Sequence, residues 1–165
     1  TAVGIAAVQA APVFLDREAS VAKAVALIEQ AADRDVRLLG FPEGFVPGHP
    51  GWVELLPFDA PRQELGRQLF EQSVEVEGDH LRPVREACRD TGVAVVSGTT
   101  GTLFNTQVHV GAGGDVACVH QKLVPTVGER LVHAPGTTGV VNSSAWAGGT
   151  VTSLICGENS HPLAQ

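Results

Sequence analysis

Three stretches of almost unbroken apolar residues alternate with segments that have the periodicity of a helix. The apolar stretches lie at 3–13, 36–42 and 93–98, and each has the length of a strand buried on both faces. Between the first two, apolar side chains recur every three or four residues through 17–34, and Asp16 is placed to cap that helix. Strands that alternate with helices in this way predict a layered α/β fold.

The rest of the chain continues this pattern. The predicted elements are a loop at 42–52, helices at 61–74 and 78–92, a hairpin at 104–122 and a strand from 149 into Cys156. The loop is dense in Pro and Gly, which rarely lie inside regular structure. The hairpin adds antiparallel pairing, so the sheet is predicted to be mixed. No linker or repeat divides the chain, and we interpret residues 1–165 as one domain or as part of one.

Charge and cysteine content restrict the possible partners and the compartment. A net charge of −7 argues against nucleic acid or an anionic membrane as the main partner, because both attract basic surfaces. No apolar run reaches membrane-spanning length, and residues 1–13 lack the basic flank of a signal peptide. Three widely spaced cysteines are a poor disulfide framework and fit a reducing compartment. We therefore expect a soluble, cytoplasmic protein, and small neutral substrates are compatible with its charge.

Three residues with reactive side chains stand where predicted strands run out into loops. Glu43 follows the strand at 36–42, Lys122 follows the hairpin, and Cys156 follows the last strand. Sites in layered α/β folds lie at such strand ends. A thiol, a carboxylate and an ammonium group can together act as nucleophile, general base and electrophile in acyl transfer. These three residues are therefore the candidates for chemistry.

Each candidate also has a more ordinary interpretation. A cysteine after an apolar run is more often structural, a loop glutamate can cap a turn, and a lysine at a strand end is commonly solvated. None of the six histidines has the spacing of a metal site, so no metal is predicted. His161, five residues after Cys156, is interpreted as part of a short helix rather than as the base of a Cys–His pair.

Several blocks of the sequence resemble a known family. "FPEGFVPGHP", "HQKLVPTVGERLVHAPG" and "LICGENSHPLA" are similar, in order, to the three signature blocks of the nitrilase branch of the carbon–nitrogen hydrolase superfamily. The opening "VGIAAVQAAPVFLD" resembles its first strand, and "LFNTQVHVGAGGDV" resembles its hairpin. The resemblance implies a four-layer α-β-β-α sandwich that often assembles into larger homo-oligomers. It covers about the first half of a family domain, so we expect a sandwich truncated after the nucleophile strand.

The resemblance also implies roles for four residues. Cys156 would be the nucleophile, Glu43 the general base and Lys122 the group that stabilises the tetrahedral intermediate. Glu129, in "PTVGER", matches the second glutamate, which positions the substrate and the lysine. Attack of the thiolate on a nitrile carbon would give a thioimidate and then a thioester, without a metal or an organic cofactor.

Four further residues are expected to bind substrate. Glu158, two residues after the cysteine, favours a nitrilase over an amidase, because amidase-like branches resemble C-x-D at this place. Gly157 replaces the tryptophan familiar in many members, which is expected to change the volume of the pocket. His49 and Trp52 are placed to line the pocket mouth, although a position on the loop surface is equally compatible with the sequence.

Two interpretations from different classes stay open on the sequence. The first is an enzyme that hydrolyses an organic nitrile, with an amidase or a cyanide-handling relative as the nearest alternative. The second is a truncated, non-catalytic domain that serves as an assembly piece.

Overall fold

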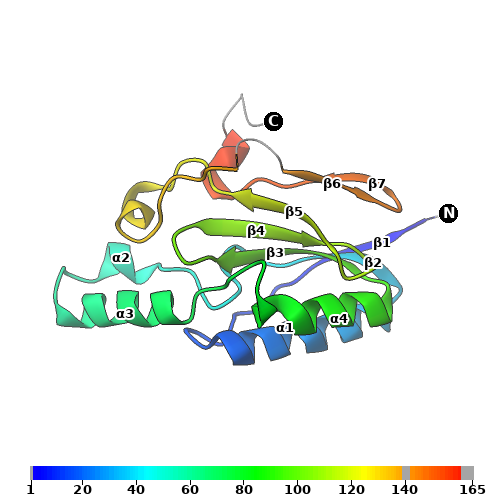
Figure 1. Ribbon diagram of the computed structural model, residues 1–165, viewed down its shortest axis with the longest axis horizontal. Coiled ribbons are helices and arrows are strands. Elements are labelled where there is room, and N and C mark those ends of the chain that lie inside the picture. Colours follow the sequence, from blue (N-terminus) through cyan, green and yellow to red (C-terminus); the bar gives the residue numbers. More distant parts are fainter. Residues whose placement is uncertain (1, 139–141, 161–165) are drawn as a thin grey trace.

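The computed structural model describes residues 2–138 and 142–160, which form a mixed sheet with helices on one of its faces (Figure 1). The main sheet contains, in order, β1 Gly4–Ala7, β2 Val36–Gly40, β3 Ala94–Thr100, β4 Asn105–Val110 and β5 Val116–Gln121. The first three strands are parallel, and the last two are antiparallel to their neighbours. The predicted α/β fold, the mixed sheet and the hairpin are thus confirmed.

Two helices, α1 Arg17–Ala32 and α4 Arg82–Thr91, pack against each other and against one face of this sheet. The Asp16 carboxylate accepts a hydrogen bond from the N–H of Ala19 at 2.9 Å and so begins α1 where the sequence predicts. Gly92 ends α4 with a φ of 71°, a conformation that glycine adopts without strain. The core between these layers is apolar, and its fully buried members include Ile28, Val93, Val108 and Cys88.

The opposite face of the β4–β5 hairpin is polar although it is buried. In the register of the two strands Gln107 pairs with His120, and His109 pairs with Cys118. Because side chains alternate along a strand, these four residues share the face that points away from the helices. His109 is 2% exposed and His120 is fully buried. A buried polar face is costly unless other segments supply partners for it.

The two helices that follow the loop after β2 form a smaller, separate apolar cluster. The loop leads into α2 Trp52–Leu55 and α3 Ala60–Glu71, where Pro61 lies in the first turn as predicted. Trp52, Val53 and Leu69 form this cluster, and the Phe14 ring meets the Trp52 ring edge-on. The remaining helices are the short 3-10 segments η1 Asp79–Leu81, η2 Val127–Leu131 and η3 Cys156–Ser160.

Two strand predictions at the ends of the chain were wrong in extent. The strand expected at 3–13 is only β1, and its Ile5 side chain is 65% exposed, because β1 pairs with β2 alone and lies at an edge of the sheet. The strand expected to run into Cys156 is β7 Gly149–Thr152, and three residues separate it from η3. It pairs instead with β6 Ser143–Trp146. The sequence did not predict β6, because two polar residues at 143–144 interrupt the pattern of a buried strand.

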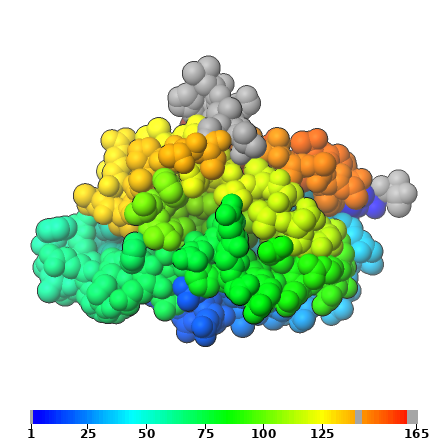
Figure 2. All heavy atoms as spheres, viewed as in Figure 1, coloured from blue at the N-terminus to red at the C-terminus, as the bar shows by residue number. Residues whose placement is uncertain are grey.

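The β6–β7 hairpin lies along β5 and above the helical layer (Figure 2). The His109 ring contacts Ser144 Oγ at 2.8 Å and Ser153 Oγ at 2.5 Å, so the polar face of the main sheet is hydrogen-bonded to this hairpin and to the residue that follows it. None of the helices in the described ranges is long and apolar enough to cross a membrane.

Candidate active site

The residues with candidate chemistry converge from four separate segments. Glu43 follows β2, Lys122 follows β5 directly, Glu129 lies in η2, and Cys156 begins η3. Figure 1 shows η3, in red, beside the end of β5. The ends of two strands in the main sheet therefore supply two of the charged groups, as the sequence predicts.

Lys122 is the centre of this cluster. Its ammonium group is 1% exposed and donates to Glu43 Oε1 at 3.3 Å and, through a short contact, to Glu129 Oε2. The Asn105 amide donates to Glu43 Oε1 at 2.6 Å and to Glu129 Oε1 at 2.8 Å. Both carboxylates are thus held by the same two donors, one charged and one neutral.

The electrostatics of the cluster keep Lys122 and Glu129 charged at neutral pH. Burial alone would lower the pKa of Lys122, but the Glu129 hydrogen bond and the charges of Glu43, Glu129 and Cys156 together raise it. Burial would likewise raise the pKa of Glu129, but the Lys122, Thr126 and Asn105 hydrogen bonds and the Lys122 charge lower it to about 2.

A capping box fixes Glu129. The N–H of Thr126 donates to Glu129 Oε2 at 2.8 Å, and the Thr126 side chain accepts from the N–H of Glu129. The spacing of Thr126 and Glu129 in "PTVGER" is the sequence signature of this motif, although the sequence analysis did not single out Thr126. The turn that starts η2 therefore aims the second carboxylate at Lys122.

Cys156 is the accessible thiol of the chain. It is exposed, whereas Cys118 is 6% exposed and Cys88 is fully buried as predicted, with burial raising the pKa of the Cys88 thiol to about 12. Cys156 has a φ of 51°, in the left-handed region that non-glycine residues rarely occupy. Backbone strain of this kind persists only where surrounding contacts hold it, and it is common at functional sites.

The structure brings two of the four expected substrate residues next to the cluster. His49 is exposed, and a ring nitrogen, a Glu43 oxygen and a Glu129 oxygen all lie within 4.8 Å of one another. Gly157 is exposed, and a Cβ at this position would lie 3.8 Å from Thr126 Oγ1. Although Glu43, His49 and Glu129 are possible metal ligands by distance, the Lys122 ammonium already contacts both carboxylates.

The other two expected substrate residues face the protein. Trp52 is 7% exposed and packs in its apolar cluster rather than at an open mouth, because its large indole surface is better buried. Glu158 is 7% exposed, and its carboxylate accepts hydrogen bonds from the N–H groups of Leu123 and Ile155 and contacts the His120 ring. A direct role in substrate binding stays a prediction for both residues.

Sequence reasoning missed two buried residues of the cluster. Asn105 is the first residue of β4, where a polar side chain next to a turn gave no signal of a long-range contact. His133 is 4% exposed, and its Nδ1 lies 3.8 Å from Glu129 Oε1, four residues earlier in the chain. The ring nitrogens of His133 have no hydrogen-bond partner within the described ranges. His161 lies outside the described residues.

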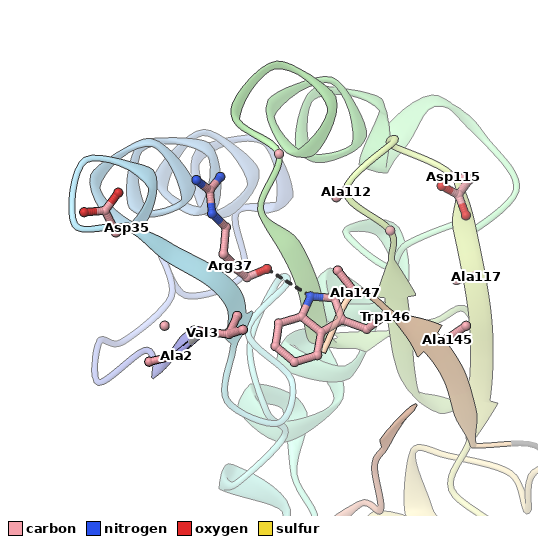
Figure 3. A pocket seen from close by; sticks show the side chains of 13 residues that line it. Ala2, Val3, Asp35, Arg37, Ala112, Asp115, Ala117, Ala145, Trp146 and Ala147 are labelled. Atoms are coloured by element: carbon pink, nitrogen blue, oxygen red, sulfur yellow. Dashed lines mark hydrogen bonds between the residues drawn. The ribbon is translucent and has the colours of Figure 1, made fainter. Parts of the chain in front are cut away.

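A cleft of about 740 Å³ is separate from this chemistry (Figure 3). It is lined by residues at the other end of the strands, including Asp35 and Arg37 at the start of β2 and Asp115 before β5. The Trp146 indole N–H donates to the Arg37 carbonyl at 3.3 Å across it. The four candidate catalytic residues do not line this cleft, so we place the site at the Lys122 cluster.

The family model described as "Carbon-nitrogen hydrolase" matches residues 4–164. An aliphatic nitrilase from Rhodococcus rhodochrous is 30% identical over 99% of this chain and 44% of its own length. A cyanide hydratase from Botryotinia fuckeliana is 33% identical over 96% of this chain and 44% of its own. The chain thus spans about half the length of the curated relatives that it matches.

Solved structures show the same fold. An amidase from Nesterenkonia sp. superimposes with a TM-score of 0.68, over 97% of this chain and 57% of its own. At 19% identity this likeness concerns the fold alone. It confirms the α/β architecture expected from the sequence, with the chain again spanning little more than half of the matching protein.

The close approach of β3 to the loop after β2 allows a test of how Glu43 is positioned. A Cβ at Gly98 would lie 2.4 Å from the Pro42 carbonyl oxygen and 2.7 Å from Glu43 Cα, and neither backbone atom can yield easily. We expect Gly98→Ala to displace Glu43 by about 1 Å and to lower kcat about 100-fold. Gly66→Ala in α3, where a Cβ meets nothing within 4 Å, is the control and should leave kcat unchanged. Equal kcat values for the two variants would contradict this positioning.

Burial of histidine predicts a loss of stability in mild acid. Burial lowers the pKa of both His109 and His133 to about 4, below the usual 6.5. Between pH 6.5 and 4 the unfolded chain takes up protons that the folded protein does not, so each ring removes up to about 1.4 kcal/mol of stability per pH unit. Below pH 4.5 Glu129 adds to this loss. Urea unfolding at several pH values should show a shallower slope for His133→Phe, and an unchanged slope would contradict the assignment.

Proposed function

Because this chain belongs to the carbon–nitrogen hydrolase family, we propose that it carries the catalytic residues of a nitrilase-type hydrolase. The observation that carries the proposal is the buried Lys122 ammonium, which contacts the carboxylates of both Glu43 and Glu129. A thiol, a base and a fixed positive charge are the parts that covalent acyl-transfer chemistry needs.

The first half of the proposed reaction forms a covalent intermediate. Glu43 takes the proton of the Cys156 thiol, and the sulfur attacks the nitrile carbon. The new C–S bond turns the triple bond into C=N, and the nitrogen receives the proton to give a thioimidate. Lys122 lies where it can stabilise the negative charge that develops on this nitrogen. Glu129 keeps the ammonium in place, because both of its oxygens are already engaged by fixed donors.

The second half releases two products. Water adds to the thioimidate carbon, with Glu43 as base, and the C–N bond breaks to release ammonia. A second water then attacks the thioester that remains, and the C–S bond breaks to give the carboxylic acid and the free thiol. The reaction consumes two waters for each nitrile and requires no redox partner.

A nitrile is the substrate class that the chain supports best. Several relatives of about 30% identity are described as nitrilases, and Glu158 follows the cysteine at the distance typical of that branch. A cyanide-handling reaction is the second candidate, because a cyanide hydratase is 33% identical over nearly the whole chain. Amidase activity has the weaker support of a shared fold.

The environment of the reaction is part of the proposal. We place the protein in the cytoplasm, because Cys156 must remain reduced to act as a nucleophile. A homo-oligomer is supported by large apolar side chains near α2 and η2 that are highly exposed, among them Leu55, Phe58 and Leu131.

The nucleophile can be tested by assaying ammonia from a panel of small nitriles, inorganic cyanide and the matching amides. We expect ammonia from organic nitriles, and we expect none from Cys156→Ala, which removes only an exposed sulfur and should unfold at the same temperature. Residual turnover in this variant would reject Cys156 as the nucleophile. Ammonia from amides alone would reassign the protein as an amidase. A folded sample that gives neither ammonia from any substrate nor formamide from cyanide would favour the non-catalytic assembly piece.

The general base can be tested with Glu43→Gln, which keeps the size of the side chain and one acceptor for Asn105. We expect kcat to fall about 10²- to 10⁴-fold, because the amide cannot take a proton from the thiol or from water. Glu54→Gln, at an exposed position of α2, removes the same charge and should have no effect. An unaltered rate in Glu43→Gln, measured by ammonia release, would remove Glu43 from the role of base.

A further inference from the structure

The segment that carries Cys156 lies outside the sheet that carries Lys122. In the part of the chain that the structure describes, β6 and β7 pair only with each other, while β5 belongs to the main sheet. The chain leaves β7 at Thr152 and reaches Cys156 without further strand pairing. The distance between the thiol and the ammonium is therefore not set by a backbone ladder, so side-chain contacts between the two segments can contribute to it.

The Glu158 carboxylate joins these two segments. Its Oε1 accepts from the N–H of Leu123 at 2.7 Å, and its Oε2 accepts from the N–H of Ile155 at 2.8 Å. Leu123 directly follows Lys122, and Ile155 directly precedes Cys156. One carboxylate thus connects the backbone next to the ammonium with the backbone next to the thiol.

A third donor fixes the same carboxylate from the sheet. His120 Nε2 lies 2.8 Å from Glu158 Oε2, and it donates because an ionised carboxylate only accepts. His120 stands two residues before Lys122 on the buried polar face of the hairpin. Lys122 is therefore flanked on both sides, at 120 and 123, by groups that hold Glu158.

Glu158 remains an anion in this position. Burial would raise its pKa, but the Leu123 N–H, the His120 side chain and the Ile155 N–H together lower it. Hydrogen bonds to an ionised acceptor are shorter and stronger than those between neutral groups. The junction is thus rigid, and it lies beneath a cysteine whose left-handed backbone needs support.

We propose that Glu158 is a positioning residue that sets Cys156 against Lys122 by holding Leu123, Ile155 and His120 together. This inference rests on the proposed catalytic roles of Cys156 and Lys122, and it departs from the expectation that Glu158 binds substrate. The acidic residue two places after the cysteine then acts on the reaction through the geometry of the nucleophile turn. His120 acts with it as the third support.

The test is Glu158→Gln in the purified protein, with two measurements. The substituted amide offers one oxygen where two backbone N–H groups need acceptors, so the turn should shift. We expect kcat to fall about 100-fold with KM within twofold of the original, because a displacement of about 1 Å costs this much in rate. Without substrate, alkylation of Cys156 by iodoacetamide at pH 7 should slow at least fivefold, since the reactivity of a thiol depends on its charged surroundings and the shifted turn changes the position of the sulfur relative to the Lys122 ammonium.

Matched variants separate positioning from folding. Glu29→Gln removes the same charge from an exposed position of α1 and should leave both measurements unchanged. If Glu158→Gln does not fold, Glu158→Asp keeps the charge but is one methylene too short to reach both Leu123 and Ile155. We expect Glu158→Asp to stay folded, as measured by circular dichroism. Its kcat should fall at least tenfold, and alkylation of Cys156 should slow as in Glu158→Gln.

Two outcomes would overturn the inference. A folded Glu158→Gln or Glu158→Asp protein with unchanged kcat and alkylation rate would show that the junction does not set the thiol. A rise in KM at constant kcat and constant alkylation would instead make Glu158 a substrate-binding residue. The alkylation measurement needs no substrate, so failure of the proposed nitrilase activity can be told apart from failure of this inference.

Discussion

The ion cluster around Lys122 is the interaction on which the candidate site depends. A lysine that is 1% exposed would lose its charge if it had no partners, because an isolated buried charge is too costly to maintain. The parts of the cluster come from segments far apart in the chain: the lysine's partner Glu43 lies 79 residues before it, and Asn105, which donates to both carboxylates, lies on the neighbouring strand. The charge is therefore stable only in the folded arrangement, and the same arrangement forms the site.

Buried polar side chains also connect the main sheet with the segments that follow it. Small α/β layers usually meet through apolar surfaces, but here the hairpin β4–β5 presents His109 and His120 to the segments that follow it. His109 is paired by Ser144 and Ser153, and His120 is paired by Glu158. Such contacts are directional, so they specify how the second hairpin and the nucleophile turn sit. The cost is an interior that loses stability when histidines must be protonated.

The sequence predicts the parts of this molecule that local rules determine. Alternating strands and helices, the Asp16 cap and the Gly92 terminus follow from periodicity and backbone preference, and Glu43 and Lys122 stand at strand ends. Asn105, His133 and the contacts of Glu158 with Leu123 and His120 could not be predicted in this way, because their partners are 4 to 62 residues away and only the fold brings them together. The first strand was overestimated because an apolar run does not reveal whether its neighbours cover it.

Glu158 shows how one sequence signal can have two physical explanations. The acid after "CG" marks a branch of the family, which suggests contact with the substrate, yet its carboxylate is turned inward to two backbone N–H groups and a histidine. The two backbone donors lie on opposite sides of the gap between two sheets. An acceptor that serves both must have two oxygens and enough length, and it must stay ionised when buried. Glutamate meets these requirements, and a residue can therefore mark a branch because it supports the nucleophile turn and not because it touches what the nucleophile attacks.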